Sequence, residues 1–377
     1  MNFGKPILGA LCFGFFMKHV DRTEALRRLV REAGASKAFL IFNQANLFYF
    51  TGFQGASALY LPLEGQGTMF VYSVNYAQAE AECREVNVQL VKPEEDVIAK
   101  VAACILRDGV GCVLADALSF DGWRKLMDAL GGKVMVEVDA QAVGRLRQVK
   151  DEDELTLMRK ACELTSLGMK VAYETLQPGI REYELAAEVE YAMRKHGSGG
   201  TAFESIVASG LSSAYPHGGC TDRCIRSGEL VVVDVGAVYG HYCADMTRTF
   251  VAGKPVAKQE RLYAMVKAAQ DAALSVIRPG VAARDVDVAA RRVLVEAGYG
   301  ENFVHALGHG VGIEVHEPPA LSQTSRDVLR AGNVVTVEPG VYLVGYGGVR
   351  IEDTVLIRAE GVEKLTRAGY GLRGEQS

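Results

Sequence analysis

The chain is poor in cysteine for its length, with 8 cysteines in 377 residues and no CxxC pair. A secreted domain held together by disulfides would be shorter and denser in cysteine, so the composition predicts a reducing, cytoplasmic location. The closest pair, Cys220 and Cys224, has no second pair with which to complete a zinc site. We interpret it as packing or chance.

Positive charge is not in excess. Lys and Arg total 41 and Asp and Glu total 46, which gives a formal net charge of −5. A chain without a basic excess is a poor partner for nucleic acid. Apolar residues make up 49% and charged residues 23%, which is typical of a globular protein and excludes a disordered or fibrous one. At roughly 150 residues per domain, the length predicts two or three domains.

Long hydrophobic runs are also missing. The apolar run from Pro6 to Met17 has 12 residues, too few for the ~20 that cross a bilayer. No small-x-small cleavage site follows it, because the chain continues directly into KHVDRTEALRR. We therefore interpret residues 1–17 as an apolar leader or, if Met17 is an internal start, as a start artefact. We expect no membrane association.

Residues 18–147 alternate short β-type runs with helical patterns, which predicts an α/β domain. A helix is expected from Asp21, where Glu24 completes a capping-box pattern. Further helices are expected at 94–107 and 122–130, and β-type runs at 38–42, 47–50, 58–63, 68–72, 113 and 134.

The charged segment GRLRQVKDEDELTLMRK, which begins at Gly144, marks the junction with a second domain, residues 148–377. The acids at 151–154 suit the positive N-terminal end of a new helix, which should extend to Leu176. Further helices are predicted near 182–195, 257–277 and 283–297. Five of the seven histidines lie between 217 and 316, so the chemistry should be sought in this half.

Two acids interrupt apolar β-type runs in the second domain. Asp234 lies within LVVVDVG, and Asp245 follows in a second run. If Tyr239-Gly240 forms a two-residue loop, the two acids face each other across a hairpin. Directly opposed carboxylates repel and weaken a sheet, so a cation is expected between them.

The pattern recurs downstream, where NVVTVE ends in Glu338 and GVRIEDTV carries Glu352. A hairpin centred on Gly345 would set these two acids against each other. Two divalent metals would neutralise the four carboxylates, and an oxygen-rich donor set favours Mn, Co, Fe or Mg. No calcium-loop motif offers a single-metal alternative.

The histidines leave two readings open. His305, His309 and His316 lie in FVHALGHGVGIEVHEPP, whose glycines argue against a metal-binding helix. The segment is either a Gly-rich loop with satisfied histidines or a loop in which one histidine binds metal and the others carry protons. His217 precedes the Asp234 run in a turn and has the same two interpretations. The remaining histidines, His19, His196 and His241, are interpreted as structural or solvent-facing.

Taken together, these motifs resemble the pita-bread metallopeptidases, a family that includes prolidase, Xaa-Pro aminopeptidase, methionine aminopeptidase and creatinase. The resemblance rests on VVDVGAVYGHYCADMTRTF, FVHALGHGVGIEVHEPP, TVEPGVY, GGVRIED, FESIVASGLSSAYPHG and the junction segment. NLFYFTGF is similar to a run in the creatinase-type N-terminal domain. The implied fold class is α+β: a creatinase-like α/β N-terminal domain, followed by a pita-bread catalytic domain.

The resemblance also implies the site. Five residues would bind two divalent metal ions, Mn or Co first, with Zn or Fe as alternatives: Asp234, Asp245, His309, Glu338 and Glu352. Asp245 and Glu352 would bridge the ions, and a metal-bridging water would be the nucleophile. The implied catalytic residues are Glu338 as general base, His217 and His316 as substrate contacts, His305 on the proline side, and Arg350, which would pair with a bridging acid or hold a substrate carboxylate.

The implied activity is hydrolysis of the bond before proline in small peptides, by a dipeptidase or an aminopeptidase that forms a homodimer. Two alternatives remain open: a non-catalytic pita-bread binding module, and a metal-independent C–N hydrolase of creatinase type.

Overall fold

A computed structural model describes residues 16–32 and 38–373. The described residues up to Leu146 form one compact unit, and those from Arg147 onward form a second. Helices and strands mix in both, so the α+β prediction is confirmed. The predicted leader lies outside the described residues, except for 16 and 17. No helix in the described ranges is both long and apolar enough to cross a membrane.

The first unit is built on a six-stranded sheet of order β4-β3-β2-β1-β5-β6, in which β2 is antiparallel to its neighbours β1 and β3 and the other pairings are parallel. The elements are β1 (Ala38–Ile41), β2 (Ala58–Leu61), β3 (Thr68–Tyr72), β4 (Asn87–Val91), β5 (Cys112–Ala115), β6 (Met135–Val138), α1 (Phe16–Glu32), α2 (Gln44–Thr51), α3 (Ser73–Glu82), α4 (Val97–Arg107), α5 (Phe120–Leu130) and α6 (Gln141–Arg147), whose last residue opens the second unit.

Two predictions in this unit are wrong. The helix expected from Asp21 begins earlier, at Phe16. The β-type run at 47–50 lies inside helix α2, because the Asn43 side chain accepts a hydrogen bond from the Asn46 backbone N–H and so caps the first turn. Gly52, in the left-handed conformation at φ 67°, ends the same helix. Local capping therefore overrides the β propensity of Phe and Tyr. Strand β4 and helix α3 were not predicted.

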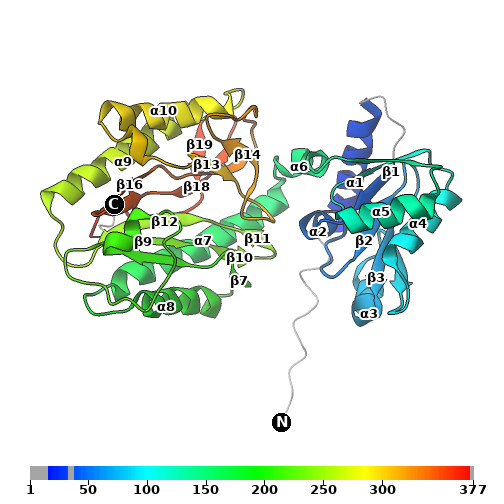
Figure 1. Cartoon of the computed structure of the whole chain (residues 1–377), viewed down its shortest axis with the longest axis horizontal. Helices are drawn as coiled ribbons and strands as arrows, with labels where there is room; N and C mark the ends of the chain where they lie inside the picture. The colour runs from blue at the N-terminus through cyan, green and yellow to red at the C-terminus, as the bar shows by residue number, and fades with distance from the viewer. Residues whose placement is uncertain (1–15, 33–37, 374–377) are drawn as a thin grey trace, which may run out of the picture. The chain divides into compact units, whose positions relative to one another are not determined.

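In the second unit, the sheets lie between two helix pairs (Figure 1). Helices α9 (Ala257–Val276) and α10 (Ala283–Glu296) cover one side, and α7 (Glu152–Thr175) and α8 (Glu182–Lys195) cover the other. The strands are β7 (Gly200–Thr201), β8 (Ile206–Ser209), β9 (Leu230–Val235), β10 (Ala237–Tyr239), β11 (Tyr242–Cys243), β12 (Met246–Val251), β13 (Gly308–Gly310), β14 (Glu317–Leu321), β15 (Val334–Val337), β16 (Gly340–Leu343), β17 (Gly347–Arg350), β18 (Asp353–Ile357) and β19 (Val362–Lys364).

Helix α7 begins where the acids predicted it. Asp151 caps it, with side-chain hydrogen bonds from the backbone N–H groups of Asp153 and Glu154, and the Glu154 carboxylate returns a bond to the Asp151 N–H. The helices predicted at 182–195, 257–277 and 283–297 are present within one residue of these bounds.

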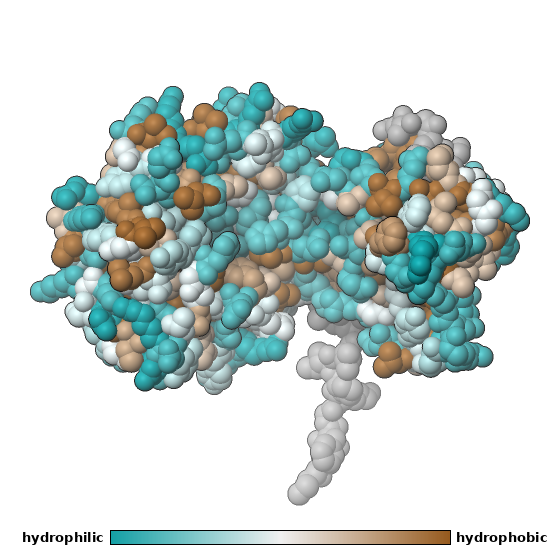
Figure 2. Space-filling view, in the orientation of Figure 1, coloured by the Kyte–Doolittle hydropathy of each residue, from teal (hydrophilic) through white to brown (hydrophobic). Residues whose placement is uncertain are grey.

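Each helix pair of the second unit packs its apolar stripe on a different sheet. Val266 and Leu294 of α9 and α10 share a core with Val335 and Val355, whereas α7 and α8 pack on β9 and β12. Polar and apolar residues are interspersed on the face of each unit seen in Figure 2. The strands packed in these two cores contain Asp234 or lie directly next to Asp245, Glu338 and Glu352 in the chain.

Candidate metal centre

The first acidic hairpin has a different register from the predicted one. Its loop is Gly240-His241, with φ 54° and 71°, since Tyr239 pairs with Tyr242. Asp234 consequently faces Thr247 rather than Asp245. The turn needs positive φ at both central residues, which glycine and, here, His241 supply. Asp245 is two residues from Thr247, so the two acids become diagonal neighbours on the same face.

The second acidic hairpin has the predicted register. Leu343 pairs with Gly347 around Gly345, and Gly340 pairs with Arg350. The same alignment continues beyond an interruption, where Val337 pairs with Asp353. Glu338 and Glu352 lie between these two sets of paired residues, at positions that the shared alignment sets opposite each other. The expected pairing of the two acids is therefore confirmed.

His309 lies on a strand rather than in the loop that was predicted. Strand β13 is held between β14 and β15, where a side chain at either flanking glycine would collide with backbone. A Cβ at Gly308 would lie 2.1 Å from the Thr336 carbonyl oxygen, and one at Gly310 would lie 2.3 Å from the Pro318 carbonyl oxygen. The glycines thus permit close approach of strands, and this approach aims the His309 side chain at the acids.

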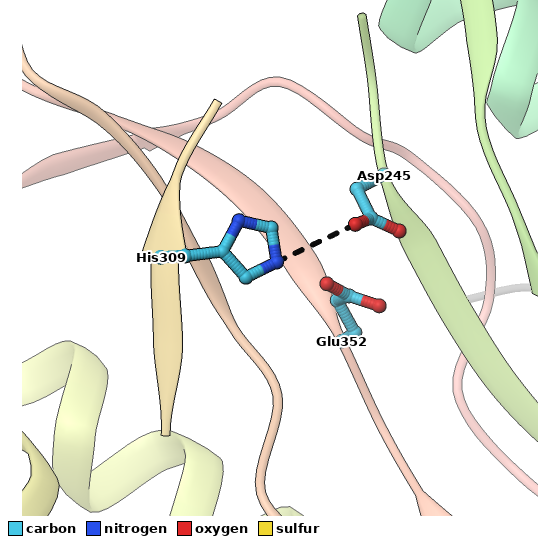
Figure 3. Close-up of side chains that lie close together, drawn as sticks. All are labelled: Asp245, His309 and Glu352. Carbon is cyan, nitrogen blue, oxygen red and sulfur yellow. Dashed lines mark ion pairs between the residues drawn. The ribbon is translucent and has the colours of Figure 1, made fainter. Parts of the chain in front are cut away.

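Three of the predicted ligands form a tight cluster. Asp245, His309 and Glu352 each offer one atom within 4.8 Å of the other two, and Figure 3 shows their side chains converging from three separate segments. His309 Nε2 lies 3.6 Å from Asp245 Oδ2 and 3.5 Å from Glu338 Oε1. Asp234, Asp245 and Glu352 are at most 9% exposed. These distances gather three acids and one imidazole, and Asp234 lines the same cavity.

Burial makes this cluster electrostatically costly. It raises the pKa of Asp245 and of Glu352 well above their ordinary values, and the carboxylates around them add to the rise. Burial also raises the pKa of Glu338 to about 8, against the opposing effect of Arg350. The pKa of His309 falls to about 4, again through burial, so its contacts with Asp245 and Glu338 are not ion pairs at neutral pH.

The donor set fits divalent metal ions. Asp234 Oδ1, Asp245 Oδ1 and Glu352 Oε1 are buried and have no hydrogen-bond partner within the described ranges, although buried polar atoms are normally paired. His309 Nδ1 lies 3.1 Å from the Gly310 carbonyl oxygen, so this nitrogen donates and Nε2 keeps a free lone pair that faces the acids. Oxygen-rich sites with one imidazole suit Mn, Co, Zn or Fe.

Arg350 makes different contacts from those expected. It pairs with Asp234, with 2.6 Å between Nη2 and Oδ2, and not with either predicted bridging acid. Its Nε donates to Thr247 Oγ1, and its Nη1 donates to the Tyr342 hydroxyl and to the Pro216 carbonyl oxygen. Because all three nitrogens are engaged inside the protein, the alternative role of holding a substrate carboxylate loses support.

The other predicted catalytic histidines share one cavity with the acids. It has a volume of about 590 Å³ and is lined by His217, His305 and His316 together with all five proposed ligands and Arg350. His316 meets His309 edge-on, with 4.2 Å between ring centroids. His305 is held by the Tyr342 hydroxyl, 2.9 Å from Nε2, and burial lowers its pKa to about 4. His241 is exposed and outside this group, as expected.

The sequence interpretation missed several side chains that support the ligands. Thr247 Oγ1 donates to Glu352 Oε2 at 2.7 Å, and Thr336 Oγ1 accepts from the His309 backbone N–H at 3.0 Å. Tyr342 links Arg350 to His305. A usable signal existed, because residues two or four positions from a ligand on a strand share its face: Thr247 follows Asp245 by two, Thr336 precedes Glu338 by two and Tyr342 follows it by four.

Comparison with known proteins identifies the class. The model of "Metallopeptidase family M24" matches residues 156–359, and that of the "Creatinase/Prolidase N-terminal domain" matches 22–149. The chain belongs to metallopeptidase family M24 and has the pita-bread catalytic fold behind a creatinase-type N-terminal domain.

Individual relatives are proline-directed peptidases. The chain is 38% identical over 348 residues to the Xaa-Pro dipeptidase of Pyrococcus furiosus, covering 92% of this chain and 98% of that protein. Among solved structures, it is similar to the Xaa-Pro dipeptidase from Bacillus anthracis (32% identity, TM-score 0.88, 94% of this chain and 99% of the other). It is also similar to the X-Pro aminopeptidase from Thermotoga maritima (34% identity, TM-score 0.83, 92% and 99%).

Proposed function

We propose that this chain is a metal-dependent peptidase that hydrolyses the bond before proline, with Xaa-Pro dipeptides as its preferred substrates. The observation that carries the proposal is the donor set at the base of the cavity: four carboxylates and one imidazole, with three buried carboxylate oxygens that lack a partner in the described ranges. Relatives named Xaa-Pro dipeptidase at 38% and 39% identity favour the dipeptidase over the aminopeptidase.

Asp234, Asp245, His309, Glu338 and Glu352 would hold two divalent ions. Such ions supply an activated water near neutral pH and polarise the scissile carbonyl. Burial raises the pKa of Glu338, and its charged form would be favoured by cations held beside it. Glu338 can then accept a proton from the attacking water and deliver it to the leaving nitrogen.

The cavity histidines have separate tasks in this proposal. His217 and His316 would donate hydrogen bonds to the substrate carbonyl as negative charge develops on it. His305 is neutral at physiological pH, since burial lowers its pKa to about 4, and it shapes the end of the cavity that receives proline. Arg350, through its contacts with Asp234 and Tyr342, fixes the orientation of one ligand and of His305.

One assay tests both the activity and its preference. Protein stripped of metal is reloaded separately with Mn, Co and Zn, and turnover of Ala-Pro is compared with turnover of Ala-Pro-Ala. We expect metal-dependent hydrolysis with the dipeptide preferred. Preference for the tripeptide would make the chain an aminopeptidase. Stoichiometric metal binding without cleavage of either peptide would contradict the proposal.

The two alternatives give different results in the same experiment. A binding module would bind peptide with no turnover, whether or not metal is present. A creatinase-type hydrolase would act on creatine after exhaustive chelation. The retained five-residue donor set argues against both. The homodimer and the cytoplasmic location remain predictions, which gel filtration and cell fractionation would test.

A further inference from the structure

The segment that opens the second unit carries two buried cations. The side chains of Arg147 and Lys150 are 5% and 1% exposed, respectively. Lys150 Nζ lies 2.7 Å from Glu317 Oε1, and Arg147 Nη2 contacts the other oxygen of the same carboxylate. Arg147 Nη1 also lies 2.9 Å from Glu314 Oε2. The two acids stand on either side of His316, two residues before it and one after it.

The loop that carries His316 is shaped around the Glu317 carboxylate. A Cβ at Gly312 would lie 2.1 Å from Glu317 Oε1, so this carboxylate occupies the space that a side chain would fill. The Gly312 carbonyl oxygen accepts a hydrogen bond from the Cys243 backbone N–H at 2.7 Å. At the far end of the same loop, the His316 ring packs against the ring of His309. The position of His316 therefore depends on where Glu317 is held.

The segment that carries the two cations is hydrogen-bonded to the residues just before strand β15. The Lys150 backbone N–H donates to the Gly332 carbonyl oxygen at 2.9 Å, and the Asn333 amide donates to the Gln148 carbonyl oxygen at 2.9 Å. Asn333 directly precedes strand β15, whose end leads to Glu338. The atoms of these ion pairs are buried and closely spaced, and the segment that carries the two cations is hydrogen-bonded to the backbone beside β15. The pairs can therefore fix the position of Glu317 relative to that strand.

The charge balance keeps the contacts intact at neutral pH. Burial opposes ionisation of Glu317, but Lys150 and Arg147 outweigh it and lower its pKa. The guanidinium beside Glu317 and Glu314 likewise has its pKa raised despite burial. Two cations therefore face two anions, and loss of one member leaves a buried charge without compensation.

We propose that Arg147 and Lys150 are positioning residues for the reaction: through Glu317 and Glu314 they hold His316 against His309 at the substrate end of the metal centre. The substrate contact made by His316 rests on the proposed function. The placement of its ring does not, so the two ideas can fail separately. Neither cation lines the cavity, and both act through another residue.

A double-mutant cycle tests the inference. Glu317→Gln should lower kcat/KM about tenfold, the size typical of residues that orient a metal-site ligand or its neighbours. In a His316→Ala background, Glu317→Gln should lower kcat/KM by less than about twofold, because the side chain that Glu317 positions is already absent. In a His217→Ala background it should again cost about tenfold, since His217 lies in a different loop. A tenfold loss in both backgrounds would overturn the proposal.

Two controls separate positioning from general stability. Glu229→Gln removes a charge from the partly buried pair with Arg223, neither of which lines the cavity, and should leave kcat/KM unchanged while lowering the melting temperature. If Glu317→Gln does not fold, Glu314→Gln, whose side chain is 45% exposed, replaces it. It should lower kcat/KM about twofold to threefold with the same dependence on His316, and a loss that persists without His316 overturns the proposal.

A structural measurement covers the case in which the wild type cleaves no proline peptide. Crystals of the Glu317→Gln variant should show the His316 ring displaced from its 4.2 Å centroid contact with His309, with the five proposed ligands unmoved. An unmoved His316 ring would overturn the inference whatever the activity of the protein.

Discussion

The hydroxyl oxygen of Tyr342 lies 2.8 Å from Nη1 of Arg350 and accepts its hydrogen bond. The same hydroxyl is 2.9 Å from His305 Nε2, to which it can donate. Since Arg350 also pairs with Asp234, a proposed metal ligand is linked to a cavity histidine through two intermediate side chains. Burial raises the pKa of Tyr342 to about 12, so the hydroxyl keeps its proton and the direction of this chain is fixed.

Tyr342→Phe should therefore lower kcat/KM about tenfold while metal content stays the same. The variant keeps the ring but removes the acceptor for Arg350 and the donor for His305. Steady-state kinetics on Ala-Pro, together with metal analysis, measures both quantities. Tyr346→Phe is the matched control, because the Tyr346 hydroxyl is buried without a partner in the described ranges and should contribute nothing. Equal activities for the two variants would show that the hydroxyl chain has no role.

Asp245→Asn should abolish metal binding at one or both positions and reduce kcat/KM at least 100-fold. It removes one anionic donor from a cluster that burial already makes costly to ionise. The metal-free variant should nevertheless melt at a higher temperature than the metal-free wild type, because burial disfavours the charged form of Asp245 and the Asn side chain has no charged form to disfavour. Added metal at 100 times its Kd should stabilise the wild type by about 2.7 kcal/mol, and the variant by less. Elemental analysis and thermal melts check this, with the exposed Asp285→Asn as control. Full metal content in Asp245→Asn would count against the ligand assignment.

The stability of the metal-free protein should fall as pH rises from 6.5 to 8. Glu338 has its pKa raised from 4.5 in the unfolded chain to about 8 in the folded one. Across this window the folded state binds more protons than the unfolded state, so stability decreases by about 1.4 kcal/mol per pH unit for each such group. Below pH 6.5 the buried histidines, whose pKa values are lowered, act in the opposite direction.

Urea unfolding with chelator at the two pH values measures this fall. Glu338→Gln should reduce it, since the variant has no proton to lose at that position. Saturating Mn should also reduce it, because bound cations keep the acids ionised in the folded state. A wild-type stability that rises over this range would refute the assignment of Glu338 as a group protonated in the metal-free fold.

Asp116→Ala should destabilise the first unit by about 2–4 kcal/mol. This carboxylate is 4% exposed and joins the end of β5 to the start of α2. Its Oδ1 accepts from the Phe42 backbone N–H, and its Oδ2 accepts from the Asn46 amide, both at 2.8 Å. The substitution removes the acceptor for both. Urea unfolding followed by Trp123 fluorescence measures the loss, and Asp121→Ala, an exposed helix acid, is the control. Equal midpoints for the two variants would show that Asp116 is not structural.

The two acidic hairpins could be predicted because an acid inside a run of β-branched residues is rare. The alternation of side chains along a strand then indicates which face of the sheet the acid lies on. The register of the first was wrong by two residues, since the loop was predicted at Tyr239-Gly240 and lies at Gly240-His241, where the histidine has a positive φ. An error of two leaves every side chain on its own face. Asp234 and Asp245 therefore stayed on the correct side of the sheet despite the wrong partners.

Other parts of the site could not be read from spacing. The choice of His309 among the histidines came from family resemblance, because its aim depends on strand β13 packing between two others. The meeting of the hairpins depends on contacts between distant strands: the Glu352 backbone N–H donates to the Thr247 carbonyl oxygen at 3.1 Å. The helix at 44–51 was missed for a local reason, because its capping residues outweigh the β propensity of its aromatic residues.

The crowding of acids at the metal centre has a calorimetric consequence. At neutral pH the metal-free protein retains a proton on Glu338, whose pKa burial raises to about 8, and burial also favours the protonated forms of Asp245 and Glu352. Bound dications would displace such protons. Heat of metal uptake should therefore differ between buffers of unlike ionisation enthalpy. The slope of that dependence counts the protons expelled into solution.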